Sequence, residues 1–267
     1  WSNKNGFKTR YQAHGSPGNL LDLYAVASIP ETEAFGSSAF PIPYLRVDKD
    51  YPAETSGRPN VLVMKFASSA ANLAGKALVS SETCTWLADH FKVSLSQVKP
   101  QVDELFTGGI NHIFFHGTTY SPRAENFPGW LFYASTNFGA TSHFHKEFHL
   151  LNEYITNCQR ILQRSTPDND VLVYFPIHDI WADTLYAADR IHMLNVHRPD
   201  KWLFPFPLGK IATELKEDGF TFDYVSDALL EKANVKNQMI SISNHTYKTL
   251  VVPECSYMPG ATIKQVL

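Results

Sequence analysis

The sequence has few cysteines and lacks any long apolar run, and both features exclude classes of protein. Its three cysteines (Cys84, Cys158 and Cys255) are widely spaced, and none belongs to a C-x-x-C pair. They therefore build neither a disulfide framework nor a cysteine zinc site, and we expect three small buried side chains. No segment approaches the roughly 20 apolar residues of a membrane-spanning helix. The first residues also lack the apolar core of a signal peptide. We expect a protein that is not inserted in a membrane.

An excess of charge of either sign is also missing. Lys and Arg number 23 and Asp and Glu number 26, which gives a formal net charge of −3. There is thus no electrostatic reason to expect nucleic acid or an anionic membrane surface as a partner. The motifs GxGxxG, GxxxxGK[ST] and GxSxG are absent, which argues against redox chemistry and phosphoryl transfer. Aromatic residues, by contrast, reach 13%, as in a large core or a site that stacks on sugars.

Short extended segments alternate with helical segments in the first half of the chain. Asn19 and Ser94 precede helical runs as N-cap residues, and Gly75 and Gly108 follow such runs as stops. Strands are expected at 7–14, 28–33, 76–82 and 111–116, and helices at 20–27, 61–75 and 94–106. Strands that alternate with helices in this way predict parallel β/α units.

A long helix over 144–164 and a polar segment over 165–170 separate this series from a second one. The second series has expected strands at 171–176, 220–224, 239–243 and 249–253, with helices at 211–217 and from 226. We therefore predict two domains, 1–164 and 165–267. The second domain is expected to be a smaller doubly wound α/β unit.

Polar residues stand at the ends of the first four expected strands. They are His14, Glu31 with Glu33, Glu82, and His116. The carboxyl ends of parallel strands meet on one face of a sheet or barrel, where active sites are built. A single residue of this kind is often structural, but four strand ends in succession favour a site.

Glu31 and Glu33 lie two residues apart in an extended segment, so their side chains point the same way. Two neighbouring carboxylates raise each other's pKa or bind a neutralising cation. A hard cation such as Ca²⁺ suits them, because it takes several oxygen ligands. The alternative is that one glutamate pairs with an arginine and the other is solvated.

Glu82 ends a strand close to Trp86, and an apolar neighbour of this kind raises the pKa of a general acid or base. The alternative is a buried glutamate bonded to the backbone. His116 suits a sugar hydroxyl or a packed core. The run His143, His145 and His149 lacks an acidic third ligand nearby, which argues against a transition-metal site there. Carboxylates and aromatic residues on a β/α scaffold favour glycoside hydrolysis.

Several ordered segments resemble glycoside hydrolase family 106, the α-L-rhamnosidases. The first is Tyr11-Gln-Ala-His-Gly15, followed by Asn19-Leu-Leu-Asp-Leu-Tyr24 and Ile29-Pro-Glu-Thr-Glu33. The second is Met64-Lys-Phe-Ala-Ser-Ser-Ala-Ala71, which leads into Gly75-Lys-Ala-Leu-Val-Ser-Ser-Glu-Thr83. The third is Gly109-Ile-Asn-His-Ile-Phe-Phe-His-Gly117, followed by Tyr120-Ser-Pro122 and Phe127-Pro-Gly-Trp130. The resemblance covers about residues 1–180.

The resemblance implies an inverting glycosidase with a (β/α)8 barrel and a calcium ion at the sugar site. Glu82 would be the base that activates water. Glu31 and Glu33 would belong to the calcium and sugar shell, although either would also suit a catalytic role. The substrate-binding residues would be Gln12, His14, Trp86, His116, Tyr120 and Trp130. The second domain resembles the flavodoxin-like or glutamine-amidotransferase-like module of related glycosidases. Such enzymes are periplasmic or secreted.

Only four β/α units precede residue 165, whereas a complete barrel needs on the order of 250 residues. We therefore expect a partial (β/α)8 barrel, its C-terminal half, with the partner acid on an earlier strand and with the chain inactive on its own. Two alternatives stay open, namely a non-catalytic carbohydrate-binding protein on the same scaffold and a glycosidase for another sugar, such as a β-galactoside.

Overall fold

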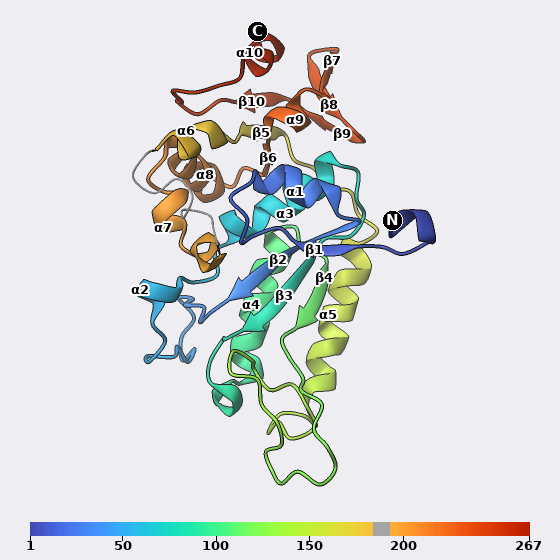
Figure 1. Ribbon diagram of the computed structural model, residues 1–267, viewed down its shortest axis with the longest axis vertical. Coiled ribbons are helices and arrows are strands. Elements are labelled where there is room, and N and C mark those ends of the chain that lie inside the picture. The colour runs from blue at the N-terminus through green and yellow to red at the C-terminus, as the bar shows by residue number, and fades with distance from the viewer. Residues whose placement is uncertain (184–192) are drawn as a thin grey trace.

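The computed structural model describes residues 1–183 and 193–267, and the first half of the chain forms a four-stranded parallel sheet (Figure 1). Its strands are β1 (Arg10–Gln12), β2 (Ile29–Phe35), β3 (Ser80–Thr85) and β4 (His112–Phe115), and they lie in the order β1-β2-β3-β4. Every neighbouring pair is parallel. The strand order follows the chain order, as the predicted β/α units require; that the sheet is part of a barrel stays a prediction.

A helix follows each of these strands. The helices are α1 (Leu20–Val26), α3 (Val61–Leu73), α4 (Leu95–Thr107) and α5 (Phe148–Leu162). Asn19 caps α1 by accepting a hydrogen bond from the Leu21 amide at 3.0 Å, and Ser94 forms a capping box with Gln97 at the start of α4. Right-handed crossovers between sequential parallel strands place such helices on one face of the sheet. The opposite face is left for a site.

The second half contains a three-stranded parallel sheet in the order β10-β5-β6. Its strands are β5 (Val171–Tyr174), β6 (Phe222–Val225) and β10 (Thr249–Val251). Its helices are α6 (Ile177–Ala182), α7 (Pro199–Trp202), α8 (Pro207–Glu217), α9 (Asp227–Leu230) and α10 (Gly260–Val266). The short elements elsewhere are α2 (Ala53–Ser56) and the 3-10 turns η1 (Asn3–Asn5), η2 (His90–Lys92) and η3 (Met193–His197).

One predicted strand of the second series has a different partner from the expected one. The segment expected at 239–243 is β8 (Met239–Ile242), which pairs antiparallel with β7 (Asn234–Lys236) and β9 (His245–Tyr247). The turn from β7 to β8 consists of Asn237 and Gln238, both with positive φ, which is the conformation of a tight hairpin turn. The prediction that this segment is a further strand of the doubly wound parallel sheet was therefore wrong. The flavodoxin-like relationship of the second half stays a prediction.

Helices α1 and α3 lie between the two parallel sheets (Figure 1). Helix α3 is apolar and buried around almost its whole circumference, as expected of a helix with structure on both sides. Phe66 of α3 stacks on Tyr224 of β6 at 4.3 Å between ring centroids and meets Phe175 edge-on at 4.9 Å. One hydrophobic core thus joins residues from both sides of position 165.

Other differences from the predictions are small. Strand β1 is shorter than the expected 7–14, and α5 begins at Phe148 rather than at 144. All three cysteines are free, but only Cys84 is buried; Cys158 and Cys255 are partly exposed. Cys158 lies on α5, where only Leu151 and Ile155 are buried. No helix of the described ranges is both long and apolar enough to cross a membrane.

Candidate functional site

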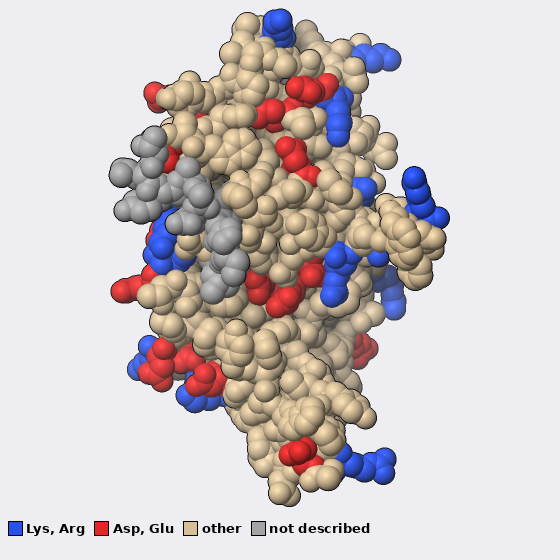
Figure 2. Space-filling model, in the orientation of Figure 1, with Lys and Arg blue, Asp and Glu red and all other residues tan. Residues whose placement is uncertain are grey.

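The pairing register gathers the acidic residues of the sheet on one face. Gln12 pairs with Glu31, Glu33 pairs with Glu82, and Glu82 pairs with Phe114. Paired residues of parallel strands point to the same side, and alternate residues share a face. Thr32 and Ala34, which lie between and after the glutamates, are buried on the opposite face. Figure 2 shows the result as a group of acidic side chains near the centre of the view, beside basic ones.

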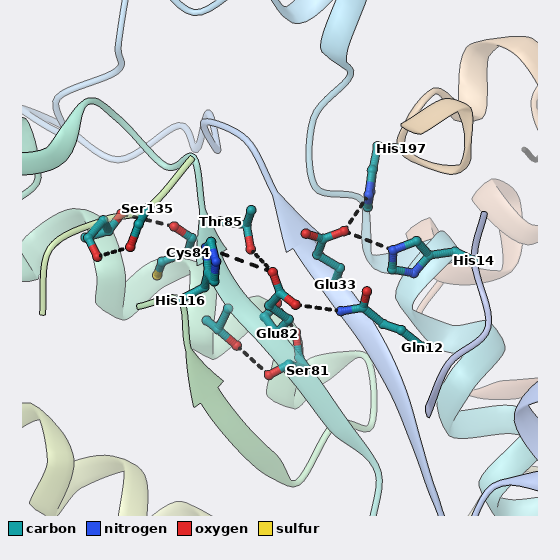
Figure 3. Close-up of polar contacts among 12 residues, drawn as sticks. Gln12, His14, Glu33, Ser81, Glu82, Cys84, Thr85, His116, Ser135 and His197 are labelled. Carbon is teal, nitrogen blue, oxygen red and sulfur yellow. Dashed lines mark hydrogen bonds and ion pairs between the residues drawn. The ribbon is translucent and has the colours of Figure 1, made fainter. Parts of the chain in front are cut away.

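Glu33 is buried and held between two histidines. Its Oε2 accepts hydrogen bonds from Nε2 of His14 at 3.0 Å and from Nε2 of His197 at 2.9 Å (Figure 3). Burial alone would raise the pKa of Glu33, but the hydrogen bonds from the two histidines outweigh it and lower the pKa far below its usual range. Burial also lowers the pKa of His197, against the opposing effect of Glu33. Glu33 is therefore an anion at neutral pH, and His197 is neutral.

Glu82 lies beside Glu33 but faces other partners. Its Oε2 accepts from Nε2 of Gln12 at 3.0 Å, and its Oε1 accepts from Oγ1 of Thr85 at 2.7 Å. Nδ1 of His116 stands 3.9 Å from Oε1, too far for a hydrogen bond. The Glu82 side chain is 30% exposed, so it is both held in place and reachable from solvent. Figure 3 shows Glu33 turned toward the histidines and Glu82 turned toward Gln12 and Thr85.

Glu31 pairs with an arginine, as one of the alternatives from the sequence anticipated. Its Oε2 lies 3.0 Å from Nε of Arg10 and accepts from Oγ of Ser80 at 2.8 Å. Burial raises the pKa of Glu31 nevertheless, because it exceeds the lowering effects of Ser80 and Arg10. The second part of that alternative is wrong, because Glu33 is buried between two histidines rather than solvated.

These partners bear on the calcium ion that the resemblance implies. Ca²⁺ takes six to eight oxygen ligands. Around Glu33 the nearest donors are two imidazole nitrogens, and Oε2 of Glu31 is engaged by a guanidinium. The described residues around the two carboxylates thus offer a nitrogen-rich and partly cationic set, which does not fit a hard cation. The calcium ion stays a prediction from the resemblance.

A series of aromatic rings connects His197, the partner of Glu33, with His116, the neighbour of Glu82. Phe35 stacks on His197 at 5.0 Å and meets Trp86 edge-on at 6.1 Å. Trp86 in turn contacts Tyr133 at 5.9 Å. Tyr133 packs against Phe132 at 4.9 Å, and Phe132 meets His116 edge-on at 5.4 Å. Apolar rings next to hydroxyl-binding groups are what a sugar ring requires.

The structure thus brings together Gln12, His14, Glu33, Glu82, Trp86 and His116 of the predicted residues, with Glu31 next to them on the same face. The other two stand on the loop between β4 and α5, where Tyr120 is 90% exposed and Trp130 is 55% exposed. His143, His145 and His149 are exposed and apart from the site.

Four residues of the site were not predicted from the sequence. His197 comes from the turn η3 in the second half, and nothing local in the sequence marks it. Phe35, Phe132 and Tyr133 were also missed. Phe35 directly continues the strand that holds both glutamates, so its place on that strand was the available signal.

Comparisons with known proteins give a family and a similar fold. The sequence profile of a family described as alpha-L-rhamnosidase matches residues 52–201, a segment that includes Glu82, Trp86, His116 and His197. The solved structure of a rhamnosidase from Novosphingobium sp. PP1Y matches with a TM-score of 0.70 at 18% identity. The match covers 99% of this chain and 22% of that chain, so this chain spans about a fifth of its length. No curated protein matches. The structural likeness establishes a shared fold.

Proposed function

Because the chain belongs to the α-L-rhamnosidase family, glycoside hydrolase family 106, we propose that its polar sheet face is part of the sugar site of a rhamnosidase. The observation that carries the proposal is the pairing of Glu33 with Glu82 on neighbouring strands, with separate partners for each. Hydrolysis of a glycosidic bond uses carboxyl groups in different protonation roles. Different surroundings for two adjacent carboxylates are how proteins divide such roles.

Glu82 is the proposed base that activates water in an inverting reaction. A base must be reachable and held in one orientation, and Glu82 is partly exposed while both its oxygens accept hydrogen bonds. Its Oε1 takes the proton of the attacking water, the water oxygen bonds to the anomeric carbon, and the leaving oxygen departs with a proton from a general acid. We assign that acid role to none of the described residues, because Glu33 is ionised and Glu31 is paired with Arg10.

The remaining side chains bind rather than react. Gln12, His14 and His116 offer polar atoms to sugar hydroxyls, and Trp86 provides an apolar wall. Tyr120 and Trp130 belong to the same proposal as outer contacts. A calcium ion at Glu31 and Glu33, which the family resemblance implies, would bind sugar hydroxyls, but the contacts of both residues do not fit it and no step of the proposal uses it. Plant or microbial rhamnosides as substrates and a periplasmic or secreted location also come from the resemblance.

The test uses this chain and its Glu82→Gln variant, with Glu153→Gln, an exposed glutamate on α5, as the matched control. Binding of methyl α-L-rhamnoside by this chain is measured by NMR. Turnover of aryl α-L-rhamnoside and aryl β-galactoside is measured in a longer enzyme that contains this chain, with the same substitutions, because none of the described residues is assigned the acid role. We expect rhamnoside binding by all three proteins, and turnover lower by about 10²–10⁴ only in Glu82→Gln. Azide should restore turnover in Glu82→Ala, because the anion replaces the activated water and gives a glycosyl azide.

Three results would overturn parts of the proposal. Binding without any hydrolysis by that longer enzyme would favour the non-catalytic carbohydrate-binding alternative. Faster turnover of the β-galactoside would refute the sugar assignment. Turnover of Glu82→Gln at the rate of the control would remove Glu82 from the base role.

A further inference from the structure

Three metal-binding side chains from distant parts of the chain meet at one point. His14 follows β1, Glu33 lies on β2, and His197 ends η3. Both imidazole Nε2 atoms approach the same carboxylate oxygen, at 3.0 and 2.9 Å. The three side chains are 11%, 8% and 4% exposed, so the cluster is enclosed rather than an accidental surface grouping.

We propose that His14, Glu33 and His197 form a binding site for a transition-metal dication such as Zn²⁺. The donor atoms of the three residues all lie within 4.8 Å of one another. Zinc bonds to imidazole nitrogen and carboxylate oxygen are about 2.0–2.1 Å long, so tetrahedral ligands stand about 3.3 Å apart. The two distances of 3.0 and 2.9 Å from the histidines to Glu33 need to widen by only a few tenths of an ångström. The donor atoms of His14 and His197, which lie within 4.8 Å of each other, need to approach to about the same 3.3 Å.

The donor types select the class of metal. Two neutral imidazoles and one carboxylate suit zinc, iron, cobalt, nickel or copper, whereas calcium prefers an all-oxygen set. This site therefore differs in both metal class and ligand set from the calcium site of Glu31 and Glu33 that the resemblance implies. Three protein ligands leave the fourth position of a tetrahedral ion for water.

The charge balance also favours a cation. Glu33 is ionised, and Glu82 adds a second carboxylate beside it, because the two residues pair on neighbouring strands. Without a metal, the two imidazoles hold Glu33 by donating from Nε2. With a metal, each imidazole carries its proton on Nδ1 instead and offers the Nε2 lone pair.

Aromatic neighbours orient the ligands. Phe35 stacks on the His197 ring at 5.0 Å, and the His14 and His197 rings meet edge-on at 5.2 Å. Rings held in this way limit the imidazoles to small movements, which a metal site requires of the groups around its ligands.

The experiment measures metal binding directly and does not depend on rhamnoside turnover. The chain is treated with a chelator, and Zn²⁺, Co²⁺ and Ca²⁺ are titrated by calorimetry, with the visible absorption of Co²⁺ as the report on coordination geometry. We expect one equivalent of Zn²⁺ or Co²⁺, with the intense Co²⁺ bands of a four-coordinate site, and no comparable Ca²⁺ binding at this cluster. Histidine-selective ¹⁵N NMR of the wild type should show two Nε2 atoms that change from protonated to metal-bound.

Variants assign the site. His197→Gln and Glu33→Gln should each weaken Zn²⁺ binding by at least about 100-fold, because loss of a direct ligand exceeds the 10–100-fold loss caused by removing an outer partner. The control is the triple variant His143→Gln/His145→Gln/His149→Gln, which removes the exposed histidine run and should bind Zn²⁺ like the wild type.

Unchanged Zn²⁺ binding in Glu33→Gln, or loss of binding in the control, would refute the assignment. So would a wild type whose two Nε2 atoms stay protonated in saturating Zn²⁺, and this last measurement stands even if the variants do not fold. That result would establish the cluster as a hydrogen-bonded group that only positions Glu33. If the cluster does not bind Zn²⁺ but the rhamnoside assays give the expected binding and turnover, the proposed function stands without the metal site.

Discussion

Glu33→Gln should destabilise the fold, and the contacts of the carboxylate give the size of the effect. The side chain is 8% exposed, and its Oε2 accepts two imidazole N–H groups. Glutamine keeps the shape and can place its amide oxygen where Oε2 was. It therefore retains both hydrogen bonds but removes the negative charge that strengthens them.

The magnitude follows from the two hydrogen bonds. A bond to a charged partner contributes about 1.5–3 kcal/mol and a neutral one about 1 kcal/mol, so the substitution loses about 1 kcal/mol at each histidine. Glutamine costs less to bury than a carboxylate, which offsets part of this loss. We expect a net loss of about 1–2 kcal/mol in the free energy of unfolding, or roughly 3–6 °C in Tm for a chain of this size. Glu33→Leu leaves both N–H groups unpaired and should cost about 2–6 kcal/mol.

The assay is urea unfolding followed by circular dichroism, in chelator, at a series of pH values. Because the pKa of Glu33 is lowered by folding from its usual 4.5, its contribution is present above pH 4.5 and is lost as the pH falls toward the folded value. The gap between wild type and Glu33→Gln should thus stay nearly constant above pH 7, where neither Glu33 nor His197 changes its charge, and shrink below pH 4.5. Glu153→Gln should stay within about 0.5 kcal/mol of the wild type. A Glu33→Gln protein as stable as the wild type at pH 7 would refute the charge-based account.

Three further predictions follow from single sites. The pKa of His197 is lowered by burial, so the folded state binds fewer protons than the unfolded state. The stability of the wild type should therefore fall as the pH drops below about 6.5. His197→Asn should flatten this pH dependence in urea titrations between pH 5 and pH 8. Asp223 is fully buried and accepts hydrogen bonds from two asparagines and a tyrosine. Asp223→Asn should therefore lower the free energy of unfolding by about 3 kcal/mol in the same assay, and a loss below about 1 kcal/mol would contradict this. Tyr133, which contacts Trp86, is 71% exposed, so Tyr133→Ala should weaken rhamnoside binding about 2–10-fold by NMR titration. Tyr120→Ala should weaken rhamnoside binding less than Tyr133→Ala does. A larger loss in Tyr120→Ala would refute the role of the aromatic rings next to Trp86.

The sequence predicts the first sheet well because its signals are local. Caps such as Asn19 and stops such as Gly75 mark where helices begin and end, and polar residues at strand ends mark the face that holds the site. Local signals do not show which residues of neighbouring strands stand side by side. Glu33 lies opposite Glu82 because of the register of β2 against β3, and register depends on packing across strands rather than on either strand alone.

The hairpin of β7 and β8 shows how a local signal can also be missed. Two-residue turns with positive φ at both positions are usually Asn-Gly or Asp-Gly, and here the pair is Asn237-Gln238. Without the glycine, the segment at 239–243 was assigned to the parallel series. Asparagine tolerates the left-handed conformation better than most residues, and glutamine adopts it here at some cost in backbone energy.

The sequence alone does not distinguish the surroundings of Glu31 from those of Glu33. They are the same residue type, two positions apart, on one face of one strand, and the sequence assigns both to one shell. In the fold, Arg10 and Ser80 engage the first, whereas the second meets His14 and a histidine 164 residues further along the chain. Folding raises the pKa of Glu31 and lowers that of Glu33. The chemical difference between the two carboxylates therefore belongs to their neighbours. It arises only when the core around α3 brings η3 of the second half against β2, so any change that loosens this core should also make the two glutamates more alike.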